Sequence, residues 1–476
     1  MTDTHRRPTG HVVLSAIDDR AYASLRHRPA PRAERYELGR QLRHQVPRSS
    51  LGDWTEPDEG DRDVVAQIDE SHQGRLAELV PIRVGRMAAS PYGFLRGTAV
   101  VMANDLAELP ATGIQPVVCG DAHFGNFGFY ASPERDLVLD LNDFDEAHPG
   151  SWEWDLRRLV ASIWVAGRHN GASEEVCSAA VASATNAYRQ QLRHLAQQPL
   201  LARSYQRLDL DHLQGTASDS DLLSQIHRAA RRARGRTSDR ALPRFTAERD
   251  GQRRIVDQPP LITRLDDAES AAVAEALDEY LTTLPPHWRR VLAGYTLVDI
   301  ALKVVGVGSV GLRAYVALLE GSSPDDVVFL QLKQARRSVL AHHVHGESAL
   351  HAHQGQRVVE YQQALQTVSD PLLGWATVGE HQYYVRQFRN MKGTIPLTAL
   401  PGAAMADYAG ICGQLLAKGH ARTSGASMIA GYLGSSDTVV KAMCRFARLY
   451  ADQTERDHQR LVDAVARGAL PSEPDA

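Results

Sequence analysis

The sequence contains few cysteines, no long apolar run and no marked excess of charge of either sign. Its four cysteines are far apart and form no CxxC pair, which argues against a disulfide framework and a zinc knuckle. No stretch approaches the ~18 uninterrupted apolar residues of a membrane span, and no apolar segment follows the polar first residues, so no secretory signal is expected. Lys and Arg number 53 against 57 Asp and Glu, and this net charge of −4 favours neither nucleic acid as a partner nor disorder. We therefore expect a cytoplasmic protein that binds neither membrane nor nucleic acid.

The residues that are present suffice for a sizeable core. The chain has 476 residues, 43% of them hydrophobic, and at roughly 150 residues per domain this length suggests two or three domains or lobes. Composition divides the chain into a polar arm at 1–75, an apolar periodic segment at 76–200, a polar and basic insert with a helix at 201–290, a β-rich block at 291–395 and helices at 396–476. We expect an α+β fold.

Acidic and amide side chains concentrate in two neighbouring segments. The first, VCGDAHFGN at 118–126, contains Asp121 at the end of a strand-like run and Asn126 five residues later. The second, VLDLNDFDE at 138–146, follows a short hairpin and contains Asp143. Phosphoryl transfer needs a carboxylate near the attacking hydroxyl and oxygen ligands for Mg²⁺ from a neighbouring loop. Asp121 fits the first role, and Asn126 and Asp143 fit the second.

These segments resemble parts of known enzymes. GDAHFGN followed by LNDFDEA is similar to the catalytic and metal loops of aminoglycoside- and choline-kinase-like phosphotransferases, which share the protein-kinase fold. WDLRRL at 154–159 is similar to the helix start that follows their metal loop, whereas Cys119 replaces a histidine that is common there. A wider run of motifs, covering nearly the whole chain, resembles a largely uncharacterised bacterial family catalogued as domain of unknown function 2252. That wider resemblance implies no particular substrate.

The nucleotide-binding parts implied by the kinase resemblance come late in the chain. Ordinary kinases place a glycine-rich loop and a lysine before the catalytic loop, but the ~120 residues before Asp121 contain no such loop. A GxGxxG motif formed by Gly306, Gly308 and Gly311 leads instead into an alternating β pattern, unlike a dinucleotide fingerprint, which opens a helix. A second strand then ends at Lys333, as in kinases. The resemblance thus predicts a protein-kinase-like two-lobed fold with permuted motif order, with ATP and Mg²⁺ as cofactors.

Further elements have expected roles in such a fold. Glu360, on a predicted helix, is the first choice for the ion-pair partner of the strand-borne lysine, and Glu347 is the second choice. The strand at 384–387 is expected to run towards a hinge that contacts adenine. Either the helix at 99–109 or the one at 413–420 takes the place of the helix that leads into the catalytic loop.

Several side chains keep two interpretations. Asp145 is either a second metal ligand or a partner of a helix dipole, while His123 is expected to orient its loop by hydrogen bonds. The histidines between 342 and 353 have irregular spacing, so we expect no metal site there. Four arginines could each contact phosphate, contact an acidic substrate or pair with a carboxylate, namely Arg86, Arg96, Arg386 and Arg422.

Three functions stay open at this point. The first is an ATP- and Mg²⁺-dependent phosphotransferase acting on a hydroxyl of a small-molecule acceptor, with nucleotidyl transfer as a variant of it. The second is a nucleotide-binding regulatory module without turnover. The third is a metal-dependent hydrolase built on Asp121, His123, Asp140 and Asp143. The third leaves the glycine loop and Lys333 without a role.

Overall fold

The computed structural model describes residues 30–57, 62–209, 213, 215, 217, 219–249, 251–304, 306, 308–345, 351–423 and 425–473. Its helices are α1 (Arg32–Gln41), α2 (Val64–Glu70), α3 (Val80–Ala88), α4 (Pro91–Gly97), α5 (Ala99–Ala107), α6 (Trp152–His169), α7 (Glu174–Gln197), α8 (Leu200–Ser204), α10 (Ser220–Arg234), α11 (Ser238–Phe245), α12 (Asp267–Thr283), α13 (Pro286–Leu292), α14 (Ala341–His345), α15 (Gln354–Leu365), α16 (Gly402–Thr423), α17 (Ala426–Leu433) and α18 (Thr438–Ala466). Its strands are β1 (Val117–Val118), β2 (Phe127–Ala131), β3 (Leu137–Leu141), β4 (His148–Pro149), β5 (Thr246–Arg249), β6 (Gln252–Ile255), β7 (Ile262–Arg264), β8 (Thr296–Lys303), β9 (Ala314–Glu320), β10 (Val327–Gln334), β11 (Gly374–Val378) and β12 (His381–Gln387).

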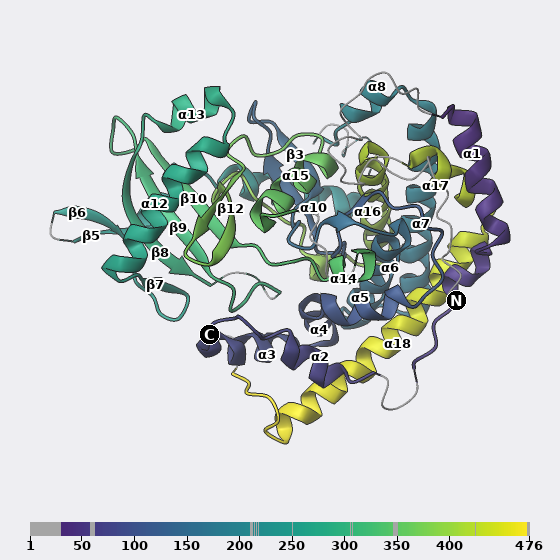
Figure 1. The fold of residues 1–476 in the computed structure, drawn as a ribbon. Helices are drawn as coiled ribbons and strands as arrows, with labels where there is room; N and C mark the ends of the chain where they lie inside the picture. Colours follow the sequence, from purple (N-terminus) through teal and green to yellow (C-terminus); the bar gives the residue numbers. More distant parts are fainter. Residues whose placement is uncertain are drawn as a thin grey trace, which may run out of the picture.

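An antiparallel sheet of six strands forms one end of the molecule, in the order β11-β12-β10-β9-β8-β7 (Figure 1). Its central strands β9 and β10 are rich in Val, Leu, Tyr and Phe, which favour strands. Tyr315 and Leu330 pack with α12 in one hydrophobic cluster on one face of the sheet. Because side chains alternate between faces, Lys333 lies with Phe329 on the opposite face. On that face Tyr384 joins the hydrophobic core of the helical end.

The opposite end is helical and holds the largest hydrophobic cluster. There α7 packs along α16, and the long α18 packs against α6 and α7 (Figure 1). Helix α6 is buried from Trp152 to Gly167. The ring of Trp152 stacks on Tyr188 of α7, with 5.9 Å between centroids. These helices form a rigid base for the loops that follow β1 and β3.

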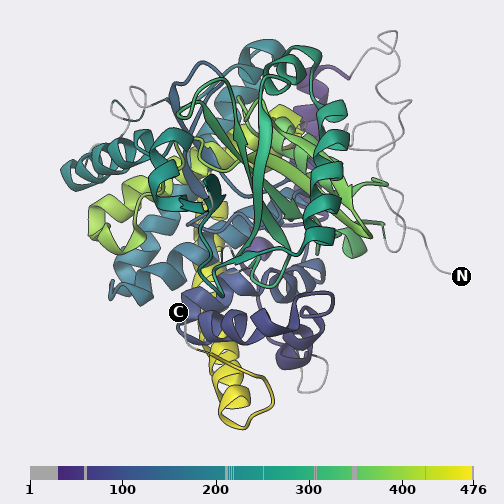
Figure 2. The same cartoon turned by 90° about the vertical axis from the view of Figure 1, so that its left-hand side faces the viewer.

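The segment that contains α2 to α5 lies beneath the sheet and beside α18 (Figure 2). Two hydrogen bonds tie it to the loop between β8 and β9: the Leu76 N–H donates to the Gly311 carbonyl at 2.8 Å, and the Arg75 guanidinium donates to the Val310 carbonyl at 2.6 Å. The segment therefore reaches both the sheet and the helical end.

The observed elements agree with the predicted α+β fold class. The predicted strand, glycine loop, strand and lysine-bearing strand are β8, the loop, β9 and β10. The helix predicted at 99–109 is α5, which follows α4 directly after Thr98. All four cysteines are free thiols. Across the described ranges, no helix has the length and apolar character of a membrane span.

Candidate functional site

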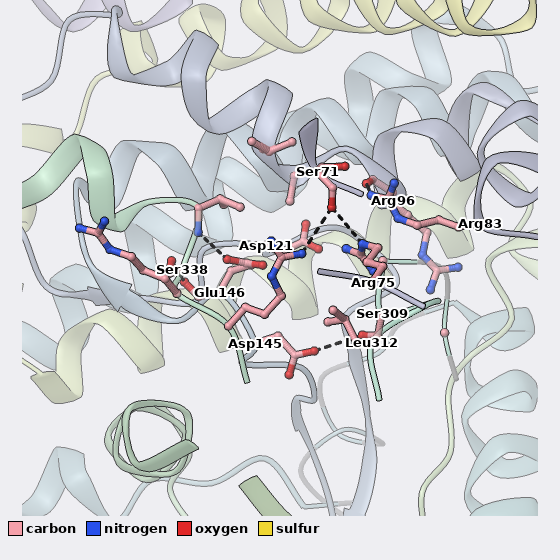
Figure 3. A pocket seen from close by; sticks show the side chains of 18 of the residues that line it. Ser71, Arg75, Arg83, Arg96, Asp121, Asp145, Glu146, Ser309, Leu312 and Ser338 are labelled. Carbon is pink, nitrogen blue, oxygen red and sulfur yellow. Dashed lines mark hydrogen bonds between the residues drawn. The ribbon is translucent and has the colours of Figure 1, made fainter. Parts of the chain in front are cut away.

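A cavity of about 460 Å³ lies where the β1 and β3 loops, the glycine loop and the segment from α2 to α5 meet (Figure 3). The first two loops contribute Asp121, Asp143 and Asp145. The glycine loop contributes Gly306, Gly308 and Ser309. The remaining wall carries several arginines, among them Arg75, Arg83, Arg96 and Arg336. The sequence-predicted catalytic and metal-binding carboxylates and part of the predicted phosphate loop thus share one cavity.

Asp155, in the first turn of α6, fixes the start of the loop that follows β1. Its two carboxylate oxygens accept from the main-chain N–H groups of Cys119 at 2.6 Å and Gly120 at 2.9 Å. His420 of α16 contacts the same carboxylate at 3.2 Å. At Gly120 φ is +79°, and a Cβ there would lie 2.3 Å from the Glu146 carbonyl oxygen. Glycine is therefore required for the close approach of the two loops.

Asn126 links the two acidic loops. Its side-chain amide donates to the carbonyl oxygen of Asp121 at 3.0 Å and to that of Asp143 at 3.1 Å. This arrangement leaves the amide oxygen as the group that could bind a cation. Asp121 itself is held by Arg158, whose Nε donates to Oδ1 at 2.7 Å. Its side chain remains 23% exposed, so its second oxygen can face a ligand in the cavity.

Lys333 of β10 contacts two carboxylates of the loop that follows β3. Its Nζ lies 2.8 Å from Asp145 and 3.7 Å from Asp143. Asp145 also accepts from the Tyr384 hydroxyl at 2.7 Å and from Ser309 of the glycine loop at 3.2 Å. Two side chains of the sheet and one of the glycine loop therefore meet at a single carboxylate of the acidic loop.

The pKa values of Asp143 and Asp145 are shifted in opposite directions. Burial, and then the charge of Asp145, raise the pKa of Asp143. Burial also opposes ionisation of Asp145, but the Lys333 ammonium and the hydrogen bonds from Lys333 and Tyr384 hold the pKa of Asp145 below its usual range. For Lys333, burial is outweighed by the charges of Asp143 and Asp145, which raise the pKa of the ammonium.

The oxygen groups at this point fit Mg²⁺. The Asp143 Oδ1 is buried without a hydrogen-bond partner, and about half of that side chain is exposed to the cavity. Mg²⁺ prefers carboxylate and amide oxygens and keeps several waters. Asp143 and the Asn126 amide oxygen would hold the ion, and Asp145 could join them if Lys333 moved away.

The glycine loop is described at Gly306 and from Gly308 onward. Gly306 and Gly311 have φ of 66° and 85°, a region that glycine adopts without steric cost. A Cβ at Gly311 would also lie 3.0 Å from the Cβ of Arg75. The glycines therefore allow the turn to form, and Gly311 allows it to pack against the segment between α2 and α3.

A family model described as "Uncharacterized protein conserved in bacteria (DUF2252)" matches residues 75–464. The chain belongs to this family. No curated protein and no solved structure is detectably similar to the chain. Every candidate site residue, from Asp121 to Glu360, lies in the DUF2252 region.

The predicted ion pair between Lys333 and Glu360 is wrong, because Lys333 pairs with Asp145 and Glu360 pairs with His351. The Glu360 carboxylate bonds His351 at 2.8 Å and Gln356 at 2.8 Å, and its side chain is 45% exposed. Arg357 is the residue of α15 that faces the acidic loop, since its buried guanidinium donates to main-chain carbonyls of Asp145 and Ala147. Helix α15 therefore braces the loop rather than the lysine. Glu347, the second choice, lies outside the described residues.

Other predicted side chains have structural partners. His123 is buried and accepts from the Gly125 N–H at 3.1 Å, and burial lowers its pKa to about 3, in agreement with the expected orienting role. Cys119 is buried, as expected of a packed thiol. Asp140 forms an ion pair with Lys418 and is fully buried. Within the described ranges, no group of three or more His, Cys, Asp or Glu side chains could hold a metal, including the described part of the histidine run.

Sequence reasoning missed four side chains that organise the site: Asp155, Arg158, Arg357 and Tyr384. Asp155 and Arg158 belong to the WDLRRL motif, where their charges at the start of an otherwise buried helix were an available signal. Arg357 and Tyr384 lie in elements that were placed correctly, but nothing in their local pattern marks them.

Proposed function

We propose that this DUF2252 protein is an ATP- and Mg²⁺-dependent phosphotransferase that acts on a hydroxyl of a small molecule. The observation that carries the proposal is the contact of Lys333 with Asp145 and Asp143 at 2.8 and 3.7 Å. These residues are about 190 positions apart in the chain. A lysine on the second strand after a glycine loop, facing a metal-binding carboxylate, is the arrangement that kinases use.

The order of elements supports a permuted protein-kinase-like fold with two lobes. The chain passes in order through β8, the glycine loop, β9, β10, α15, β11 and β12. The strands among these elements all belong to the six-stranded sheet. The chain continues into α16, where the Thr423 hydroxyl accepts from the Val117 N–H of β1 at 3.1 Å. This contact supports α16, which contains 413–420, over α5 for the place of the helix that leads into the catalytic loop. Permutation at a surface connection would account for the order of the motifs.

The proposed reaction uses the side chains in distinct roles. Asp121, oriented by Arg158, accepts the proton of the acceptor hydroxyl. Lys333 and the glycine-loop amides bind the phosphates of the nucleotide, while Asn126 and Asp143 hold Mg²⁺. When bound, Mg²⁺ neutralises charge on the transferring phosphoryl group. Most of the rate enhancement would come from positioning and charge stabilisation.

The place expected for adenine contains the charged side chain of Arg386 in this conformation. Arg386 of β12 donates to Gln331 of β10 at 3.2 Å, and its guanidinium lies 5.6 Å from the centroid of Tyr384. These side chains lie on the face of the sheet that carries Lys333. Binding of a nucleotide base there would require Arg386 to move, and we propose that it does so.

The two alternative functions are less well supported. A hydrolase built on His123 and Asp140 would need both at the metal, but His123 accepts a main-chain N–H and Asp140 is paired with Lys418. A module without turnover would have no need of a carboxylate with an open oxygen in the cavity, which Asp121 offers.

Mg·ATP should stabilise the protein, and Asp143→Asn should remove that effect. A ligand at ~100 times its dissociation constant stabilises a fold by about 2.7 kcal/mol. Thermal unfolding of wild type and variant, with and without Mg·ATP, measures the difference. Asp136→Asn is the matched control, because Asp136 is 55% exposed and pairs with Arg207 away from the cavity. An equal shift of the unfolding temperature by Mg·ATP in wild type and Asp143→Asn would show that Asp143 does not hold the metal ion.

Glu360→Gln should leave the Mg·ATP shift unchanged. Its carboxylate serves His351 and Gln356, so its loss does not alter the environment of Lys333. Lys333→Met in the same assay should abolish the shift. If Glu360→Gln also abolished the Mg·ATP shift, Lys333 would have to leave Asp145 and pair with Glu360 when the nucleotide binds.

A further inference from the structure

Four arginines converge on the wall of the cavity that faces the acidic loops, and we call them the arginine cluster. They are Arg75 between α2 and α3, Arg83 on α3, Arg96 on α4 and Arg336 after β10. Figure 3 shows Arg75, Arg83 and Arg96 on one side of the cavity, with Asp121 beside them.

Few hydrogen-bond acceptors among the described residues face the cluster, although the charges of Asp145 and Glu146 reach Arg75. Arg83 is 2% exposed, and its Nη2 donates to the Gly97 carbonyl at 2.7 Å, but its Nε and Nη1 are buried without a hydrogen-bond partner. The Nε of Arg96 is likewise buried and without a partner. Among the described residues, none of the four guanidinium groups forms an ion pair with a carboxylate. A buried, unpaired charge is costly, so it points to a ligand that supplies the missing acceptors.

The arginines also repel one another. Arg75 donates to the Ser71 carbonyl at 3.0 Å, and Arg336 approaches the same oxygen at 3.4 Å. Burial, and then the charges of Arg75 and Arg336, lower the pKa of Arg83. Burial and the charge of Arg336 lower the pKa of Arg75 to about 10. An anion between these groups would offset both effects.

Three carboxylates that line the cavity with the cluster each have another partner. Arg158 holds Asp121. Asp145 is bound to Lys333 and Tyr384. The Glu146 carboxylate accepts from the Val339 N–H at 2.7 Å. A bound anion would supply the acceptors that these carboxylates do not.

We propose that the arginine cluster binds a phosphate group of the acceptor, so that the substrate is a phosphorylated small molecule with a free hydroxyl. Guanidinium forks match the oxygens of phosphate, which carries up to two charges and three strong acceptor oxygens. Asp121, the proposed base, lines the cavity together with the cluster and the glycine loop, so a phosphate of the acceptor held by the cluster would place its hydroxyl near the base and the nucleotide phosphates. This assignment of an acceptor rests on the proposed function.

The proposed phosphoryl transfer needs no reactant besides ATP and the acceptor hydroxyl, with Asp121 as the proton acceptor. The acceptor hydroxyl oxygen bonds to the γ-phosphorus as the bond from that phosphorus to the bridging oxygen of ATP breaks. The hydroxyl proton passes to Asp121, and ADP leaves with the bridging oxygen. The phosphate already on the acceptor stays bound to the cluster and takes no part in the chemistry.

Binding of inorganic phosphate to the full chain tests the inference. Calorimetric titration should show binding that Arg336→Gln weakens about 10-fold, the size expected for one charge-assisted guanidinium contact. Arg336 is exposed, so its replacement should preserve the fold. Arg96→Gln should weaken binding similarly, and Arg234→Gln, an exposed arginine of α10, should leave it unchanged.

The same titration with saturating Mg²⁺ and a non-hydrolysable ATP analogue separates the two phosphate sites. Binding of phosphate that persists supports an acceptor site. Competition would assign the cluster to the nucleotide phosphates and overturn the inference. Tighter binding of malonate than of phosphate would overturn the choice of a phosphate group. If phosphate does not bind but Mg·ATP still gives a shift that depends on Asp143, the inference fails and the proposed function stands.

Discussion

An Asp121→Asn variant should transfer phosphate about 10²- to 10⁴-fold more slowly than wild type, the usual loss when a general base is removed. Asparagine keeps an oxygen that can accept from Arg158, which holds Asp121 at 2.7 Å, so the loop should keep its shape. The stabilisation by Mg·ATP should therefore persist. ADP formation from Mg·ATP, measured with a mixture of phosphorylated small molecules, gives the rate.

The control for this variant is Asp136→Asn, which removes the same charge at an exposed position. Its rate should equal that of wild type. Equal rates for Asp121→Asn and wild type would exclude Asp121 as the base. A wild type that binds Mg·ATP but forms no ADP with any acceptor would favour the regulatory module.

The two acidic loops could be predicted because they are close in sequence and joined by a hairpin. Strands β2 and β3 pair with Phe127 opposite Leu141, which brings the residues just before β2 next to those just after β3. Asn126 and Asp143 flank this pairing, so local pattern alone places them together. The glycine motif and Lys333 were likewise predictable, since one hairpin, β9–β10, connects them.

The contacts across long separations could not be read from the chain. Positions 357 and 360 lie three residues apart on α15, and a modest rotation of the helix decides which of them faces the acidic loop. Packing of α15 against the core turns Arg357 inward and leaves Glu360 at the surface. The arginine cluster is harder still, because Arg75 and Arg336 are about 260 residues apart. Only Arg96 of that cluster was among the arginines singled out from the sequence.

Lys418→Met should destabilise the fold by about 3–5 kcal/mol, the range for removing one partner of a buried ion pair. Lys418 of α16 and Asp140 of β3 form an ion pair in which each side chain is 1% exposed. The other Asp140 oxygen accepts from the adjacent Leu141 N–H at 3.0 Å. Without the lysine, a buried carboxylate would lose its counter-charge. Denaturant unfolding of wild type and variant measures the loss.

A second replacement separates the cost of the unpaired charge from a loss of packing. The double variant Lys418→Met/Asp140→Leu should recover most of the stability, because apolar groups of similar size commonly replace a buried pair without loss. Arg40→Met, which breaks the exposed pair of Arg40 and Glu37, should cost at most about 1 kcal/mol. A double variant as unstable as Lys418→Met would show that packing around α16, rather than charge, is lost. Since neither Lys418 nor Asp140 lines the cavity, the double variant should also retain the Mg·ATP shift, which a hydrolase site that used Asp140 would not allow.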